Sequence, residues 1–124
     1  MGLFNILGKN SAKNEAATVA NPEAPLNDRI KTLLNSSNVI LFMKGSADAP
    51  MCGFSARVVE VLNHQGTEFK TFDILSDSEI RQGVKEYSNW PTYPQLYVKG
   101  KLVGGCDIIM ELAESGELTE VLKA

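Results

Sequence analysis

The sequence has little of what disulfide-stabilised, metal-binding or membrane-spanning proteins depend on. It contains two cysteines and one histidine, too few for a disulfide-scaffolded secreted domain or for a metal site built on histidines. No apolar run approaches the roughly 20 residues that a membrane-spanning helix needs. The net charge of -3 argues against a general nucleic-acid-binding protein. We therefore expect one domain in a reducing compartment, with no membrane and no nucleic-acid partner.

The first 24 residues also lack a sustained hydrophobic period, and they mix asparagine, alanine, serine and lysine with proline. This composition predicts a flexible N-terminal extension or linker over residues 1–24 and a folded domain over residues 25–124. The segment contains no arginine and its apolar run, Leu3–Leu7, is short, which argues against a secretory or organellar targeting peptide. The role of this segment, and whether the chain is a fragment of a multidomain protein, stay open.

One stretch has the features of a reactive thiol site. The apolar run 39–43 predicts a buried strand, and apolar residues from Phe54 to Leu62 recur at helical spacing. Cys52 therefore lies where a loop becomes a helix, and the free N–H groups of a first helical turn lower the pKa of a thiol there. Lys44 adds positive charge, so the stretch predicts a thiolate that acts as a nucleophile or binds a soft metal. The alternative is a buried core cysteine, which the surrounding glycine, proline and serine disfavour.

The third position after this cysteine is Ser55, so no disulfide can form within the motif. Any redox cycle then needs an external thiol or the distant Cys106. A disulfide requires Cα atoms within about 7 Å of each other. The sequence leaves open whether Cys106 pairs with Cys52 or is a bystander thiol.

The remaining pattern predicts an α/β protein. We expect a first helix capped by Asn27, a strand over 68–74, a helix capped by Ser76 or Asp77, and a helix that Asp107 begins. Strands at 95–98 and 101–103 flank the hairpin turn Lys99-Gly100, and a short helix follows Gly116. The order helix, β-α-β, helix, β-β-α predicts a four-stranded mixed sheet with helices on both faces, which is the thioredoxin fold.

Three motifs at ordered spacing resemble those of the monothiol glutaredoxins of the CGFS type, over residues 26 to 123. The motifs are Cys52-Gly53-Phe54-Ser55, Trp90-Pro91-Thr92-Tyr93-Pro94-Gln95 and Gly104-Gly105-Cys106-Asp107. The stretch 93–100 is most similar to domains of multidomain nucleocytoplasmic members. This resemblance implies the cytoplasm, with the nucleus as a second compartment, and single-domain members make the mitochondrion the alternative.

The resemblance implies a glutathione site around Cys52. Lys44 and Arg81 would bind a glutathione carboxylate as cations. Pro94 would be cis, so that the backbone of Tyr93 pairs with the cysteinyl part of glutathione like an added strand. The plainer alternatives are a surface charge for Arg81 and a trans turn for Pro94.

The same resemblance assigns four further cofactor-binding residues. Gly105 would let the chain approach glutathione closely, and the Cys106 N–H and Asp107 would hold its γ-glutamyl end. Phe54, inside the first motif, is counted with them. Asp107 has the alternative role of a helix N-cap.

Members of this family share a [2Fe-2S] cluster between two protomers, with one motif cysteine from each and two glutathione thiols completing the ligands. Cys52 would therefore be both the catalytic residue and the metal ligand. The implied function is iron-sulfur cluster transfer and iron homeostasis, by a homodimer when the cluster is bound and a monomer when it is not. Implied partners are glutathione, apo iron-sulfur acceptor proteins and a BolA-like protein. The alternative is a glutathione-dependent thiol-disulfide oxidoreductase, at most weakly active, with Cys52 as nucleophile.

Overall fold

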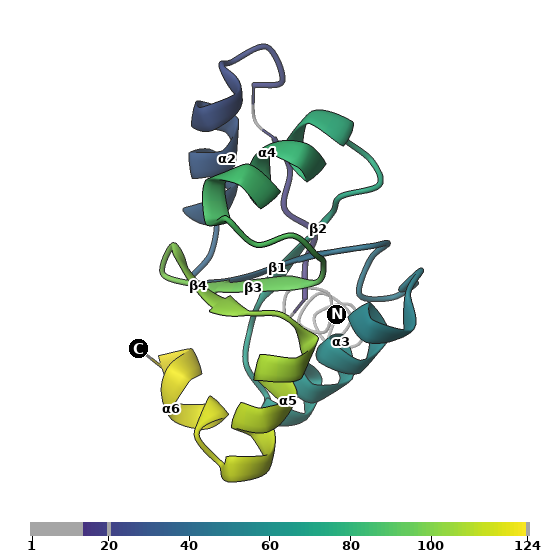
Figure 1. Ribbon diagram of the computed structural model, residues 1–124, viewed down its shortest axis with the longest axis vertical. Helices are drawn as coiled ribbons and strands as arrows, with labels where there is room; N and C mark the ends of the chain where they lie inside the picture. Colours follow the sequence, from purple (N-terminus) through teal and green to yellow (C-terminus); the bar gives the residue numbers. More distant parts are fainter. Residues whose placement is uncertain (1–13, 20, 124) are drawn as a thin grey trace, which may run out of the picture.

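The computed structural model describes residues 14–19 and 21–123, which form a mixed sheet covered by helices on both faces (Figure 1). In chain order the elements are α2 (Leu26–Leu34), β1 (Val39–Met43), α3 (Gly53–Gln65), β2 (Lys70–Asp73), α4 (Ser78–Ser88), β3 (Gln95–Val98), β4 (Lys101–Gly104), α5 (Cys106–Ser115) and α6 (Leu118–Lys123). The four strands lie in the order β2-β1-β3-β4, with β1 and β2 parallel and the other pairs antiparallel. The predicted mixed sheet and thioredoxin fold are confirmed.

The central strand β1 divides the core into two layers, because successive side chains of a strand point to opposite faces. Leu41 and Met43 pack with α3, α5 and α6, whereas Ile40 and Phe42 pack with α2 and α4. Figure 1 shows these two helical layers above and below the sheet. The expected covering of both faces is therefore confirmed.

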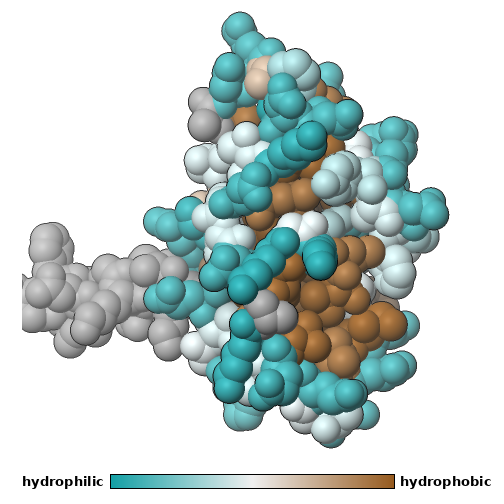
Figure 2. Space-filling model, turned by 90° about the vertical axis from the view of Figure 1, so that its left-hand side faces the viewer, coloured by the Kyte–Doolittle hydropathy of each residue, from teal (hydrophilic) through white to brown (hydrophobic). Residues whose placement is uncertain are grey.

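Apolar side chains also reach the surface on the α5 and α6 side of the sheet. Val103, Leu112 and Val121 are partly buried against the core there. Figure 2, which views the molecule from the left of Figure 1, shows apolar surface gathered over the same part of the molecule. Within the residues described, no helix combines the length and apolar character needed to cross a bilayer.

Strand register brings three connections to one end of the sheet. Phe42 pairs with Gln95, and Leu96 pairs with Gly104. The loop after β1, the loop before β3 and the turn after β4 therefore meet at the same edge. This is the end at which Cys52 precedes α3.

Most of the predicted element ends are confirmed, because capping is a local property. The Asp77 carboxylate accepts the N–H groups of Glu79 and Ile80 at the start of α4. Gly66 ends α3 with φ 72°, and Lys99 and Gly100 both have positive φ in the hairpin turn.

Three details of the predicted elements are wrong. Asn27 lies inside α2, which follows Pro25 and has no side-chain cap; a proline needs no N–H partner at a helix start. Asp107 lies in the first turn of α5 and does not cap it, since Gly105 occupies the cap position. The predicted strand over 68–74 is shorter, at Lys70–Asp73.

The segment before α2 touches the sheet where it is described. Thr71 donates its N–H to the Glu15 carbonyl at 3.0 Å and accepts the Ala17 N–H at 2.7 Å. Ala17 is buried in the core layer of α2 and α4, and Glu15 lies 3.7 Å from the Lys70 ammonium. Residues 1–13 of the predicted extension lie outside the described residues, but Glu15–Ala17 lie against the outer edge of β2.

Candidate functional site

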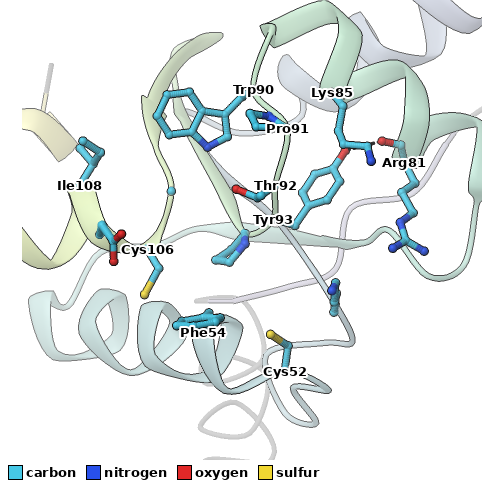
Figure 3. Close-up of a pocket in the computed structure, with 14 residues that line it drawn as sticks. Cys52, Phe54, Arg81, Lys85, Trp90, Pro91, Thr92, Tyr93, Cys106 and Ile108 are labelled. Carbon is cyan, nitrogen blue, oxygen red and sulfur yellow. Dashed lines mark hydrogen bonds between the residues drawn. The ribbon is translucent and has the colours of Figure 1, made fainter.

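A cleft of about 490 Å³ opens where the three connections meet, within the range of small-molecule sites in proteins. Every site residue predicted from the sequence lines it. These residues are Lys44, Cys52, Phe54, Arg81, Tyr93, Pro94, Gly105, Cys106 and Asp107. Figure 3 shows three sides of the cleft, with Cys52 at the start of α3, Cys106 at the start of α5, and Arg81 on α4. Tyr93 lies in the loop that follows α4, and Lys44 directly follows β1.

Cys52 is the cap residue of α3, with extended backbone angles (φ -152°, ψ 137°), and its side chain is partly exposed. The backbone N–H groups of Ser55 and then Phe54 lower the pKa of the Cys52 thiol, more than its burial raises it. The Lys44 ammonium and the Ser55 hydroxyl lower the pKa further. The predicted thiolate-forming position at a helix start is therefore present.

Phe54 does not belong to the core, although its spacing predicted an apolar helix face. Its side chain is 58% exposed and that of Met51 is 69% exposed. In the view of Figure 3, the Phe54 ring lies between the sulfur atoms of Cys52 and Cys106. The thiol is thus flanked by apolar side chains that are open to solvent.

The loop between β1 and α3 closes on itself and fixes Lys44. The Met51 N–H bonds to the Lys44 carbonyl at 2.9 Å, and the Gly45 N–H bonds to Oδ1 of Asp73 at 2.9 Å. Gly45 has φ 88°, and a Cβ there would lie 2.5 Å from the Ala49 carbonyl oxygen. Asp73, which the sequence did not single out, joins this loop to the end of β2.

The loop before β3 forms the opposite wall. The peptide bond between Tyr93 and Pro94 is cis, as predicted. The Tyr93 hydroxyl donates to the Arg81 carbonyl at 2.7 Å, which joins the loop to α4. Burial, and secondly the nearby Tyr97, raise the pKa of Tyr93, so its hydroxyl stays protonated and can donate.

The start of α5 closes the third side. A Cβ on Gly105 would lie 3.2 Å from Nε1 of Trp90 and 3.3 Å from the Pro94 carbonyl oxygen, so the chains approach closely there. The first-turn N–H groups of Cys106 and Asp107 have no partners within the helix. Burial raises the pKa of the Cys106 thiol, despite the nearby Arg57. The pKa of the Cys52 thiol is therefore lowered, whereas that of the Cys106 thiol in the same cleft is raised.

Charge is unevenly distributed around the cleft. Lys44, Arg81 and Lys85 line it together with one carboxylate, Asp107. Lys85 was not predicted, although it follows Arg81 by one helical turn and so shares its face. Trp90, Pro91 and Thr92 of the second motif, and Ile108, also line the cleft. The cleft suits an anionic ligand that also carries apolar parts.

Within residues 14–19 and 21–123, no three His, Cys, Asp or Glu side chains gather closely enough to hold a metal ion. His64 lies in the last turn of α3, at the opposite end of that helix from Cys52.

Comparison with known proteins gives one consistent family. The glutaredoxin family model matches residues 39–103. Monothiol glutaredoxin-S17 of Arabidopsis thaliana is 62% identical over 100 residues, which are 81% of this chain and 20% of that protein. A ycf64-like monothiol glutaredoxin of Synechocystis is 54% identical over 103 residues, which are 83% of this chain and 94% of that protein. The chain spans between a fifth and about a third of the first relatives, such as human glutaredoxin-3 (37%).

Solved structures agree with this result. Reduced apo GrxS14 of poplar superposes with a TM-score of 0.71 at 47% identity, covering 79% of this chain and 90% of that one. A buckwheat glutaredoxin solved as a glutathione complex has a TM-score of 0.67 at 27% identity, covering 79% and 86%. Both structures share the overall fold of this chain. The chain belongs to the glutaredoxin family, and Ser55 in place of a second motif cysteine makes it a monothiol member.

Proposed function

We propose that this chain binds glutathione in the cleft and, with it, holds a [2Fe-2S] cluster between two protomers for transfer to acceptor proteins. The observation that carries the proposal is the position of Cys52. It is a thiol of lowered pKa at the mouth of a cationic cleft, with no second cysteine in its motif. Such a thiol is free to ligate a metal and has no partner within its own motif with which to form a disulfide.

The residues of the cleft fit glutathione end to end. Lys44 and Arg81 suit the glycine carboxylate on one side, since both are cations. The N-terminus of α5 suits the γ-glutamyl carboxylate, and Asp107 suits the γ-glutamyl ammonium. The Tyr93 backbone, beside the cis bond, can pair with the extended cysteinyl part. The glutathione complex of the buckwheat relative supports this assignment.

The number of sulfur ligands supports sharing the cluster between protomers. A [2Fe-2S] cluster takes four sulfur ligands, and each protomer would supply Cys52 and one glutathione sulfur. The exposed Met51 and Phe54 side chains surround the thiol and would be buried when a second protomer approaches. We accordingly propose a homodimer with the cluster and a monomer without it.

Apo iron-sulfur proteins are the proposed recipients of the cluster, and a BolA-like protein is a proposed partner. The proposed location is the cytoplasm, with the nucleus as the second compartment.

The second candidate function is reduction of glutathione mixed disulfides, which the lowered pKa and partial exposure of Cys52 favour. The Cys52 thiolate would attack the glutathione sulfur of a protein–glutathione disulfide, forming a Cys52–glutathione disulfide and releasing the protein thiolate. A second glutathione thiolate would then attack that disulfide, freeing Cys52 and leaving oxidised glutathione. Overall, one free glutathione is consumed, and the protein–glutathione disulfide is replaced by a free protein thiol and one molecule of oxidised glutathione.

Anaerobic reconstitution with iron, sulfide and glutathione distinguishes the two functions. The proposal expects a coloured dimer by visible absorbance and size exclusion, requiring both glutathione and Cys52. Cys52→Ser should abolish the colour, whereas the control variant His64→Gln, at the far end of α3, should retain it. A colourless monomer that rapidly reduces a glutathionylated peptide would instead establish the oxidoreductase.

A further inference from the structure

Gln95 does not line the cleft, yet it holds the loop that does. Its side chain is 0% exposed. Nε2 donates to the carbonyl oxygens of Trp90 and Thr92, each at 3.1 Å. Oε1 accepts from the Tyr97 hydroxyl at 2.8 Å and lies 3.2 Å from Oγ of Ser88. A buried carboxamide is costly unless it is bonded in this way, so the site is built around this side chain.

The partners fix the orientation of the carboxamide. The two backbone carbonyls can only accept hydrogen bonds, so the nitrogen has to face them. The oxygen then faces the Tyr97 hydroxyl, which burial keeps protonated by raising its pKa. The Ser88 hydroxyl also lies 2.8 Å from the Val84 carbonyl oxygen and can donate to it instead. Tyr97 is therefore the main hydrogen-bond donor to Oε1 of Gln95. In this orientation, only the NH2 group of the Gln95 side chain can donate hydrogen bonds to the loop.

The loop needs such an external anchor. Pro91 and Pro94 carry no N–H, so the segment has few backbone donors with which to stabilise itself. The carbonyls that Gln95 holds belong to the residues on either side of Pro91. The same loop packs on the start of α5, where Gly105 approaches Trp90 and Pro94 closely. A shift of the loop would therefore displace two walls of the cleft.

We propose that Gln95 is a positioning residue of this cleft, whose carboxamide fixes the backbone of residues 90–94 in the shape that receives the ligand. The inference rests on the proposed binding of glutathione and deepens it. Gln95 acts through the loop, since it lies behind Trp90 and Thr92 and does not line the cleft. Loss of its two donations should loosen the loop and weaken glutathione binding, while Cys52, which caps α3, keeps its reactivity.

The test compares Gln95→Met with Tyr97→Phe. Methionine has a similar length and no donor, whereas phenylalanine removes one hydroxyl on the acceptor side and leaves both donations to the loop in place. We expect Gln95→Met to raise the Kd for reduced glutathione by about tenfold, the equivalent of ~1.4 kcal/mol. We also expect it to speed exchange of the Trp90 N–H, which bonds to the Lys85 carbonyl at 3.1 Å, in the unliganded protein. Tyr97→Phe should change the Kd by less than about twofold, and both variants should keep the wild-type rate of Cys52 alkylation.

Unchanged exchange in Gln95→Met, or faster exchange with a wild-type Kd, would overturn the proposal. If Gln95→Met does not fold, the wild-type carboxamide protons decide: slow exchange of both supports two donations, and fast exchange overturns them. If the wild type itself does not bind reduced glutathione, the proposed function fails, and the exchange of the Trp90 N–H still shows whether Gln95 orders the loop.

Discussion

The hydroxyl oxygen of Ser55 lies 3.3 Å from the backbone nitrogen of Lys44 and accepts its N–H, which joins the first turn of α3 to the end of β1. Ser55 is fully buried. It is also the strongest influence on Cys52, because its backbone N–H contributes most to lowering the pKa of that thiol. The residue that replaces the second motif cysteine therefore has a structural role of its own.

Replacing Ser55 with alanine should destabilise the protein by about 1–3 kcal/mol, because the Lys44 N–H loses its buried acceptor. The Cys52 pKa should rise slightly, since only the hydroxyl contribution is lost and the backbone N–H remains. Urea unfolding measures the first effect. Ser115→Ala, which removes an exposed hydroxyl, is the control and should change stability by less than about 0.5 kcal/mol. Equal stability of both variants would contradict the expectation.

The two thiols should differ in reactivity because their pKa values move in opposite directions. As pH rises, Cys52 becomes half thiolate at a lower pH than Cys106. At neutral pH we expect Cys52 to be alkylated by iodoacetamide on the order of tenfold faster, measured by peptide mass spectrometry across a pH series. Lys44→Gln should move the Cys52 curve to higher pH and leave that of Cys106 in place. Coincident curves in the wild type would refute this prediction.

Arg81 on α4 and Lys44, directly after β1, should contribute to glutathione binding if the proposed function is correct. Arg81→Gln removes charge-assisted hydrogen bonds, and we expect the Kd to rise at least about tenfold. Lys101→Gln, on the exposed start of β4, also removes one positive charge and should leave the Kd within about twofold. Calorimetric titration at two salt concentrations measures both. Similar losses in the two variants would indicate a general charge effect with no specific contact.

Much of this structure follows from local patterns in the sequence. Asp77, Gly66 and the Lys99-Gly100 turn act through their own backbone neighbours, so their positions are readable without the fold. Phe54 was counted among the site residues and does line the cleft, but helical spacing alone does not show that its side chain stays exposed. Gln95 was recognised as part of a strand and a motif, but its partners come from three separate elements. All of these partners lie within residues 88–97, so its role depends on how the loop folds back between α4 and β3, which the residue types alone do not show.

Glycine positions near the thiol offer a direct test of the loop geometry. Gly45→Ala should cost about 2–4 kcal/mol, because the backbone is left-handed and the added Cβ meets the carbonyl oxygen of Ala49. Gly53→Ala is the matched control, since nothing lies within 4 Å of its added Cβ. It should be neutral or stabilising by about 0.5 kcal/mol. Urea unfolding midpoints compare the two variants, and a smaller loss at Gly45 than at Gly53 would contradict the described loop.

The pairing of Glu15–Ala17 with β2 can be tested with two adjacent alanines. Ala17 is buried and Ala16 is exposed. Ala17→Asp would place a charge in the core layer, so the segment should detach and the Thr71 N–H should exchange at least about tenfold faster. Ala16→Asp should leave Thr71 protected. Hydrogen exchange followed by NMR measures both, and equal protection of Thr71 in the two variants would rule out the pairing.

That pairing also limits how this protein can associate with itself. An outer strand with free peptide groups can recruit a strand from another molecule and begin aggregation. Here both backbone groups of Thr71 are already bonded within the chain, so two copies cannot merge their sheets through the middle of β2. Among the described residues, β4 is the other outer strand. Of the two outer strands described, β4 is therefore the one more open to pairing with a strand of another molecule.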